Sequence, residues 1–371
     1  MTAEEIQEKR SQNAAQGWLI IRKIVLPLLA MIAVVGFITD GWVSSKIVNA
    51  PLSNAYKVGK LIDPESHPNE IAIFGPSIAR NAYYCDSLGA NYYNYSMENA
   101  GVVINELMLR LETSKREKTA PVIMDFHFRF LEVDTTGASV NLRTYLPFTN
   151  DSRVREFLRE HGRSRPHQSL KGARYFGVYS SYAKDYLAEV FQPRKLYHRG
   201  GVFNKKAPAQ AAFDKKIEAR RNAGPQPYSW TETPQSRRRG DLLGSQEYVN
   251  RLDSIIAANP QRLFILMGSP RHYTVLEALE PTGGYDDMKN YGREMLKKHS
   301  NVRVVIFEAD YPDSYFKDTG HLSLEGARIF SGQMRRAMEA NSLYFTGEGD
   351  GKPDEVPSQD DILIVQLEAA K

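Results

Sequence analysis

A nearly unbroken apolar run lies close to the N-terminus of this 371-residue chain and limits the surroundings in which it can fold. Ile24–Thr39 reads IVLPLLAMIAVVGFIT, Trp18–Ile21 is also apolar, and Arg22 and Lys23 stand between them. A membrane span needs about 20 apolar residues. The segment reaches that length when the long side chains of Arg22 and Lys23 extend to the membrane interface.

Three interpretations of this segment compete. A buried helix of a soluble protein usually keeps a polar face, and this segment has none. A cleaved signal peptide needs a small-residue cleavage site, and the DGWVSS that follows is a poor one. Trp18 and Trp42 bracket the run as interfacial aromatic residues do. The sequence therefore predicts a single uncleaved transmembrane anchor over residues 18–42.

The charges around the anchor predict its orientation. Basic residues outnumber acidic ones before the apolar run, with Lys9, Arg10, Arg22 and Lys23 against Glu4, Glu5 and Glu8. By the positive-inside rule, residues 1–17 stay in the cytoplasm. The rest of this single-pass membrane protein is then expected in the periplasm or outside the cell.

Composition narrows the class of protein. The chain is 42% hydrophobic and 25% charged, as ordinary globular proteins are. A formal net charge of +4 is too small to indicate nucleic-acid binding, so no nucleic-acid partner is predicted. The single cysteine, Cys85, excludes an intramolecular disulfide and a cysteine-rich metal site. We find no dinucleotide fingerprint, phosphate loop or zinc spacing, and predict neither a metal nor a cofactor.

Short apolar runs alternate with longer segments of helical spacing beyond the anchor. Five runs are predicted strands: Glu70–Phe74, Asn91–Ser96, Ala120–Phe128, Arg262–Pro270 and Val302–Asp310. The last helix is expected to start near Ser323. Because the runs are continuously apolar, they favour a parallel sheet covered by helices on both faces. In such sheets the active site lies at the C-terminal ends of the strands.

The rest of the chain divides by composition. We predict an irregular stalk over residues 43–69, an α/β domain over 70–345 with a long basic insertion at about 130–260, and an acidic, disordered tail over 346–371. An insertion this long is usually a lid, a binding element or a disordered segment. A solvated basic surface is as good an interpretation of it as a site for an anionic polymer.

A possible nucleophile follows the first predicted strand. IAIFGPSIARN places Ser77 on a Gly-Pro-Ser turn at the C-terminal end of that strand, before a helical segment. The backbone N–H groups of the next turn point into the same space and can stabilise an oxyanion. Serine is a poor nucleophile unless a base takes its proton.

A possible base follows the last predicted strand. Asp318 and His321 lie three residues apart in DTGHLSLEGARIF, on a turn before an amphipathic helix. His321 could take the proton of Ser77, and Asp318 could hold the imidazole in the required tautomer. An ordinary turn former and a satisfied polar residue are the competing interpretation. A metal site formed by this pair with His127 or His272 has only the residue types in its favour.

These motifs resemble the SGNH/GDSL hydrolase superfamily. A Gly-x-Ser after the first strand and an Asp-x-x-His before the last helix are similar to its terminal blocks, over about residues 70–130 and 260–340. The nearer likeness is to a membrane-anchored bacterial branch that includes the D-alanyl-transfer proteins of teichoic acid and the acetyl-transfer proteins of alginate. The resemblance implies a three-layer α/β sandwich with a five-stranded, flavodoxin-like parallel sheet.

The resemblance also implies site residues. Ser77 would be the nucleophile and Asp318 and His321 the other members of the triad. The family's oxyanion donors are the backbone N–H of that serine, a Gly after the second strand and an Asn after the third. The Gly position falls on Ser96 here, whose N–H could donate, and the Asn position has no clear match, with His127 a conceivable replacement.

Two more residues are candidates for substrate binding. Arg271 and His272 in SPRHY follow the fourth predicted strand, where they could bind a carboxylate or phosphate of the substrate. Residues of an exposed loop with no such role are the competing interpretation.

The sequence thus predicts a membrane-anchored serine esterase or O-acyltransferase that forms an acyl-Ser intermediate. Location and resemblance suggest an acylated cell-envelope polysaccharide or lipid as substrate, with a multispanning membrane acyltransferase as a conceivable partner. The alternative is a non-catalytic envelope scaffold that keeps the fold and binds a polymer, which the incomplete oxyanion set favours.

Overall fold

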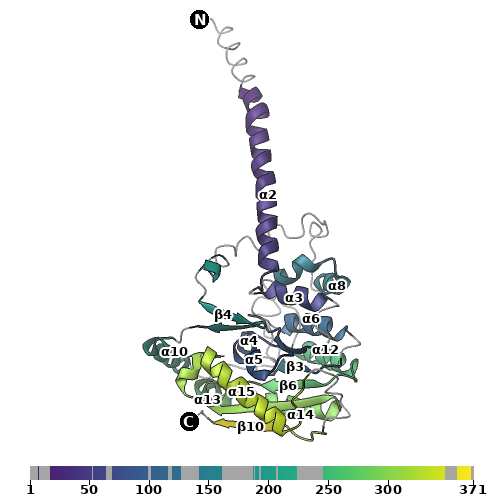
Figure 1. Cartoon of the computed structure of the whole chain (residues 1–371), viewed down its shortest axis with the longest axis vertical. Coiled ribbons are helices and arrows are strands. Elements are labelled where there is room, and N and C mark those ends of the chain that lie inside the picture. Colours follow the sequence, from purple (N-terminus) through teal and green to yellow (C-terminus); the bar gives the residue numbers. More distant parts are fainter. Residues whose placement is uncertain are drawn as a thin grey trace.

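A computed structural model shows how these segments fold (Figure 1). It describes residues 7, 17–51, 53–63, 69–98, 102–115, 119–126, 142–160, 187, 189–191, 194–205, 208–223, 245–346 and 357–368. His127 and most of the central part of the basic insertion lie outside these ranges.

Six parallel strands form the central sheet, in the order β2-β1-β3-β6-β7-β10. Their bounds are β1 Ile71–Phe74, β2 Tyr92–Asn94, β3 Val122–Asp125, β6 Phe264–Gly268, β7 Val302–Asp310 and β10 Leu363–Glu368. The five predicted strands and their parallel arrangement are confirmed. The predicted strand number and the predicted disorder of the whole acidic tail are wrong, because Leu363–Glu368 forms β10, which pairs with β7 from Val305 to Asp310.

Helices cover both faces of the sheet, as predicted. One core cluster joins the face of Ala72 and Phe74 to α3 Asn54–Ile62, α6 Val102–Thr113, η3 Leu142–Phe148, α8 Ser152–Glu160, α12 Ser245–Ala257 and α14 Gly284–Lys298. The other joins the face of Ile71 and Ile73 to α4 Ser77–Ala82, α5 Cys85–Leu88, α10 Gln210–Asn222 and α15 Leu324–Ala340. The alternation along β1 shows that this strand contributes side chains to two separate cores.

Several smaller elements complete the domain. Two hairpins are antiparallel: β4 Lys195–His198 with β5 Gly201–Asn204, and β8 Phe316–Asp318 with β9 His321–Leu322. The short helices are α13 Tyr273–Leu279, η7 Glu280–Thr282 and η8 Asp313–Tyr315. The predicted insertion therefore contains η3, α8, β4, β5, α10 and α12.

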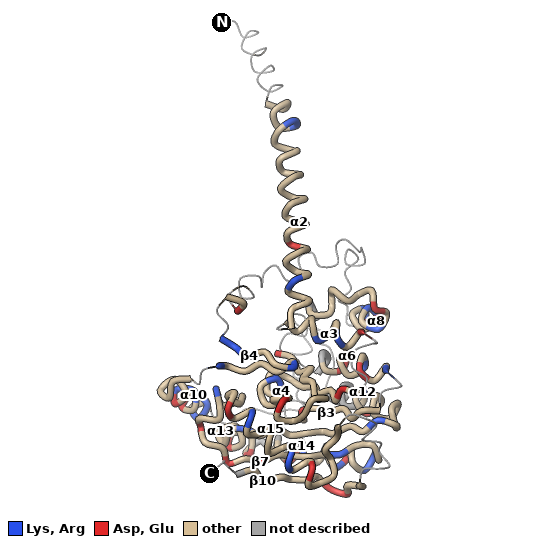
Figure 2. Tube along the Cα trace, viewed as in Figure 1, with Lys and Arg blue, Asp and Glu red and all other residues tan. Residues whose placement is uncertain are grey.

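The N-terminal apolar segment is one long helix that leaves the domain (Figure 1). It runs from Gly17 to Val48, through a π-helical turn at η1 Ile21–Val25 into α2 Leu26–Val48, and is a candidate membrane span. Figure 2 shows few charged residues along α2, whereas charges of both signs cover the domain. The structure thus bears out one apolar helix that could span a membrane, while its orientation stays a prediction.

The predicted irregular stalk is wrong. α2 continues to Val48, and α3 begins soon after, with the Ser53 side chain accepting the N–H of Tyr56 as an N-cap. Ala55, Val58 and Leu61 of α3 are fully buried in the same cluster as Ile47 and Val48 of α2, because their spacing forms one helical face. The segment after the anchor is therefore part of the domain.

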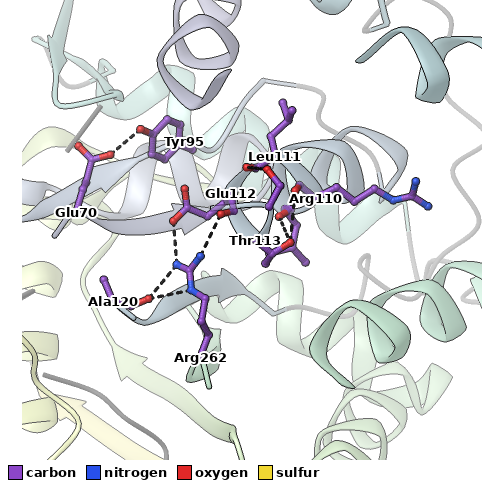
Figure 3. Close-up of polar contacts among 10 residues, drawn as sticks. Glu70, Tyr95, Arg110, Leu111, Glu112, Thr113, Ala120 and Arg262 are labelled. Carbon is purple, nitrogen blue, oxygen red and sulfur yellow. Dashed lines mark hydrogen bonds and ion pairs between the residues drawn. The ribbon is translucent and has the colours of Figure 1, made fainter. Parts of the chain in front are cut away.

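A buried ion pair holds the N-terminal edge of the sheet together (Figure 3). The Arg262 guanidinium, before β6, donates to Glu112 Oε1 at 2.9 Å and to the Ala120 carbonyl at 2.9 Å. Both charged side chains are completely buried. Since a buried charge is costly without its partner, this contact ties α6 to the beginnings of β3 and β6.

Replacing Arg262 by alanine removes this partner from the buried Glu112 carboxylate. We expect the free energy of unfolding to fall by about 3–5 kcal/mol, measured by guanidinium denaturation followed by circular dichroism. Arg335→Ala is the control, because Arg335 and Glu339 form an exposed pair on α15 whose loss should change stability far less. Equal losses in the two variants would contradict the structural role of Arg262.

Candidate active site

The turn after β1 places Ser77 at the C-terminal edge of the sheet. β1 ends at Phe74, Gly75 and Pro76 follow, and Ser77 is the first residue of α4. A β-carbon on Gly75 would stand 2.6 Å from that of Ala79 and 2.7 Å from that of Asp125, so only glycine fits this turn. The strand order reverses between β1 and β3, which is where open α/β sheets form their binding crevice.

The β8–β9 hairpin brings Asp318 and His321 to the same edge. His321 Nε2 lies 2.9 Å from Ser77 Oγ, and His321 Nδ1 lies 2.7 Å from Asp318 Oδ1. About a quarter of each hairpin side chain is exposed, 24% for His321 and 28% for Asp318, so the group is open to solvent on one side. The predicted proximity of the three residues is confirmed, and their role in catalysis stays a prediction.

The Asp318 carboxylate is charged and oriented by its surroundings. Burial acts to raise its pKa, but the hydrogen bond from His321, the charge of that imidazole, the Gly320 N–H and the Lys317 ammonium outweigh burial and lower the pKa. An ionised Asp318 accepts a hydrogen bond from the Nδ1–H of His321. Nε2 is then left to accept the Ser77 hydroxyl proton, which is the tautomer that a general base requires.

Asn81 and Lys317 connect the Ser77 turn to the hairpin that carries Asp318 and His321, and sequence reasoning missed both. The Asn81 amide donates to the Ser77 carbonyl at 2.5 Å, and the Lys317 ammonium donates to the Asn81 Oδ1 at 2.8 Å. Burial lowers the pKa of Lys317. In the sequence, only their positions could have indicated this role: Asn81 follows Ser77 by one helical turn, and Lys317 directly precedes Asp318.

The predicted oxyanion role of Ser96 is contradicted. Ser96 is completely buried, and its N–H donates to the Asn94 side-chain oxygen at 3.0 Å, so this N–H is already used. The N–H of Ser77 belongs to the first turn of α4, where the backbone N–H groups have no acceptor within the helix. His127, the other predicted donor, lies outside the described residues.

The predicted substrate-binding residues are buried and occupied. Arg271 is 8% exposed, and its guanidinium lies 3.5 Å from the Asp125 carboxylate, itself completely buried. Asp125 also accepts from Ser269 Oγ at 2.7 Å and from Tyr83 at 3.0 Å, and burial raises its pKa. Arg271 therefore pairs with Asp125 in the interior beneath Gly75, and its role in substrate binding stays a prediction.

His272 is likewise part of the interior. It is 1% exposed, caps α13, and its two ring nitrogens lie 2.9 Å from the Thr274 hydroxyl and 3.1 Å from Asp313 Oδ1. The rings of Phe213 and Phe316 pack edge-on against it. Burial lowers the pKa of His272, so the ring is held neutral, and the binding role predicted for it is wrong.

A cleft of about 590 Å³ opens on the other half of the same sheet edge. It lies between α13, α14 and the ends of β7 and β10, and its lining includes Tyr273, Glu277, Tyr285, Asp286 and Asp310. Ser77, Asp318 and His321 are not among the lining residues, so this cleft supplies no substrate pocket for these three residues. Within the described ranges, no cluster of His, Cys, Asp and Glu could hold a metal ion.

Comparison with known proteins adds no identity. No protein-family model matches this chain, and neither does any curated protein. The functional interpretation therefore depends on the geometry of the site.

The Gly75 turn gives a direct test of the site's construction. Gly75→Ala forces Ala79 or Asp125 to move, so we expect a loss of about 1–3 kcal/mol in the free energy of unfolding. Gly332→Ala is the control, because its β-carbon would approach no atom closer than the Arg336 side chain at 3.8 Å; alanine in helix α15 should stabilise by up to about 1 kcal/mol. A Gly75→Ala protein as stable as Gly332→Ala would contradict the close packing of this turn.

Proposed function

We propose that this protein is a membrane-anchored serine esterase or O-acyltransferase of the SGNH type, acting from the outer side of a membrane. The observation that carries the proposal is the continuous contact from Asp318 through His321 to Ser77, at 2.7 and 2.9 Å. Two further features support it. The site lies where the strand order of the central sheet reverses, and strands β2-β1-β3-β6-β7 follow the order of flavodoxin-like sheets.

Acylation begins when Ser77 Oγ attacks the carbonyl carbon of an ester. The hydroxyl proton passes to His321 Nε2, and the Asp318 carboxylate stabilises the resulting imidazolium. The Ser77 N–H at the start of α4 donates to the oxyanion of the tetrahedral intermediate. The bond to the alcohol oxygen then breaks, the alcohol takes the proton from Nε2, and an acyl-Ser77 remains.

Deacylation reverses these roles with a second oxygen nucleophile. Water or a sugar hydroxyl gives its proton to His321 Nε2 and attacks the acyl carbon, and Ser77 Oγ leaves with that proton. Water yields hydrolysis, and a hydroxyl of a polymer yields acyl transfer. An acylated envelope polysaccharide or lipid is the substrate class in keeping with the N-terminal span, and a multispanning membrane acyltransferase is the partner that could deliver the acyl group.

A non-catalytic scaffold is the second candidate function. The Ser96 N–H is already bonded, which favours this second function. Among the predicted oxyanion donors that lie in the described residues, only the Ser77 N–H is left. A protein of this kind would keep the fold and bind a partner or polymer without turnover.

A fluorophosphonate probe separates the two functions. We expect the detergent-solubilised wild type to be labelled at Ser77, because His321 activates the hydroxyl, and Ser77→Ala and His321→Ala to take no label. Cys85→Ser is a matched control outside the site. A folded wild type that stays unlabelled at every pH tested would favour the scaffold.

The Asp318 carboxylate has its own kinetic signature. In Asp318→Asn an amide replaces the acceptor of the Nδ1 proton, so the imidazole is held in the tautomer that cannot accept from Ser77. We expect kcat for p-nitrophenyl acetate to fall by about 10³–10⁴-fold. The melting temperature checks that the variant is folded, and a loss of less than tenfold would exclude a triad role for Asp318.

A further inference from the structure

Lys57 is a buried lysine on α3, in the segment between the apolar helix and β1. It is 2% exposed, and its ammonium donates to two backbone carbonyls, those of Ser96 and of Gly200, the latter at 2.6 Å. Burial lowers its pKa well below the ordinary value, and the charge of Arg80 adds to the effect. Burying an ammonium group costs free energy, so a lysine held between two carbonyls indicates a structural role.

The Ser96 carbonyl belongs to the turn that holds the nucleophile segment. On one side of it, the Tyr95 N–H donates to Ile73 at 2.8 Å, and on the other, the Met97 N–H donates to Gly75 at 3.1 Å. These bonds continue the β1–β2 ladder to the residue before Pro76. By fixing the Ser96 carbonyl, Lys57 fixes the turn that determines where Gly75, and therefore Ser77, is placed.

The Gly200 carbonyl belongs to the turn of the β4–β5 hairpin. The neighbouring Arg199 carbonyl accepts the Asn94 N–H at 2.9 Å, which presses the hairpin onto β2. Gly200 has φ +79°, and a β-carbon there would stand 1.9 Å from the Asn94 oxygen. Phe203 of the hairpin meets Tyr84, just after α4, with ring centroids 5.4 Å apart. Lys57 thus joins the β2 turn to the hairpin beside α4.

We propose that Lys57 is a positioning residue for the Ser77 nucleophile, and this rests on the proposed esterase or acyltransferase function. Its ammonium fastens the β2 turn and the hairpin to α3, whose apolar face shares a core with the end of α2. A methionine in its place has a similar length but donates no hydrogen bond. The two carbonyls then lose their donor, and Ser77 shifts relative to His321.

Lys57→Met and Lys60→Met, both in the full-length protein in detergent, test this role. Lys60 is the matched control, since it lies on the same helix, is mostly buried, and pairs with the side chains of Glu70 and Tyr95, whereas Lys57 binds the Ser96 and Gly200 carbonyls. A fluorophosphonate titrates the active sites of each variant. Steady-state hydrolysis of p-nitrophenyl acetate then gives kcat per titrated site and KM, and thermal melting gives stability.

For Lys57→Met we expect kcat per titrated site to fall roughly 10- to 100-fold with KM within about twofold, because a small displacement of the nucleophile raises the barrier without removing substrate contacts. Lys60→Met should stay within about threefold of the wild type even if its melting temperature falls equally. A merely structural role lowers the titrated fraction and leaves kcat per site unchanged.

Wild-type kcat per site in Lys57→Met overturns the positioning role and leaves the proposed function standing. Wild-type protein that takes no fluorophosphonate overturns the proposed function, and the positioning role falls with it. Should Lys57→Met fail to accumulate, Lys57→Gln replaces it: its shorter side chain reaches one carbonyl at most, so kcat per site should fall at least about threefold. Unchanged turnover in Lys57→Gln likewise overturns the inference.

Discussion

The hydrogen bond between Ser77 and His321 joins positions 244 residues apart, and the site exists only because the sheet brings them to one edge. All six strands run in the same direction, so the turn after β1 and the hairpin after β7 open on the same side. The hairpin is fixed where α15 begins: the Ser323 N–H donates to the Tyr315 carbonyl at 2.8 Å, and a β-carbon on Gly326 would stand 2.1 Å from that oxygen. The imidazole is therefore placed by backbone packing on both sides.

The features that sequence predicted are those fixed by local chemistry. A continuously apolar run such as Ile71–Phe74 needs cover on both faces, which implies a parallel sheet with two layers of helices. The Gly-Pro-Ser turn and the Asp318-to-His321 spacing each determine a short segment on their own. Combined with the rule that parallel strands end at one edge, they were enough to predict a contact between residues 244 positions apart.

The features that sequence missed depend on partners far along the chain. Whether the Ser96 N–H is free depends on the Asn94 rotamer, and whether His272 is exposed depends on Phe213 from the insertion and on Phe316. In β10, the alternation of Leu363, Val365 and Leu367 was hidden by the acidic, Gly- and Pro-containing residues before it. Its pairing with β7 can be predicted only when it is known that β7 would otherwise be the edge strand of the sheet.

Helix α3, which the sequence did not predict, changes how the N-terminal apolar helix is joined to the domain. A flexible stalk lets a domain sample distances that grow with the square root of the linker length. Here Ile47 and Val48 of α2 share a core with Val58 and Leu61 of α3, and Lys60 pairs with Glu70 at the entrance to β1. In the proposed function, a membrane span that continues as a packed helix would hold the candidate active site at one height and one angle to the bilayer. That arrangement would suit the proposed acyl donor presented at a fixed height, by the membrane or by a protein within it, better than a polymer free in solution.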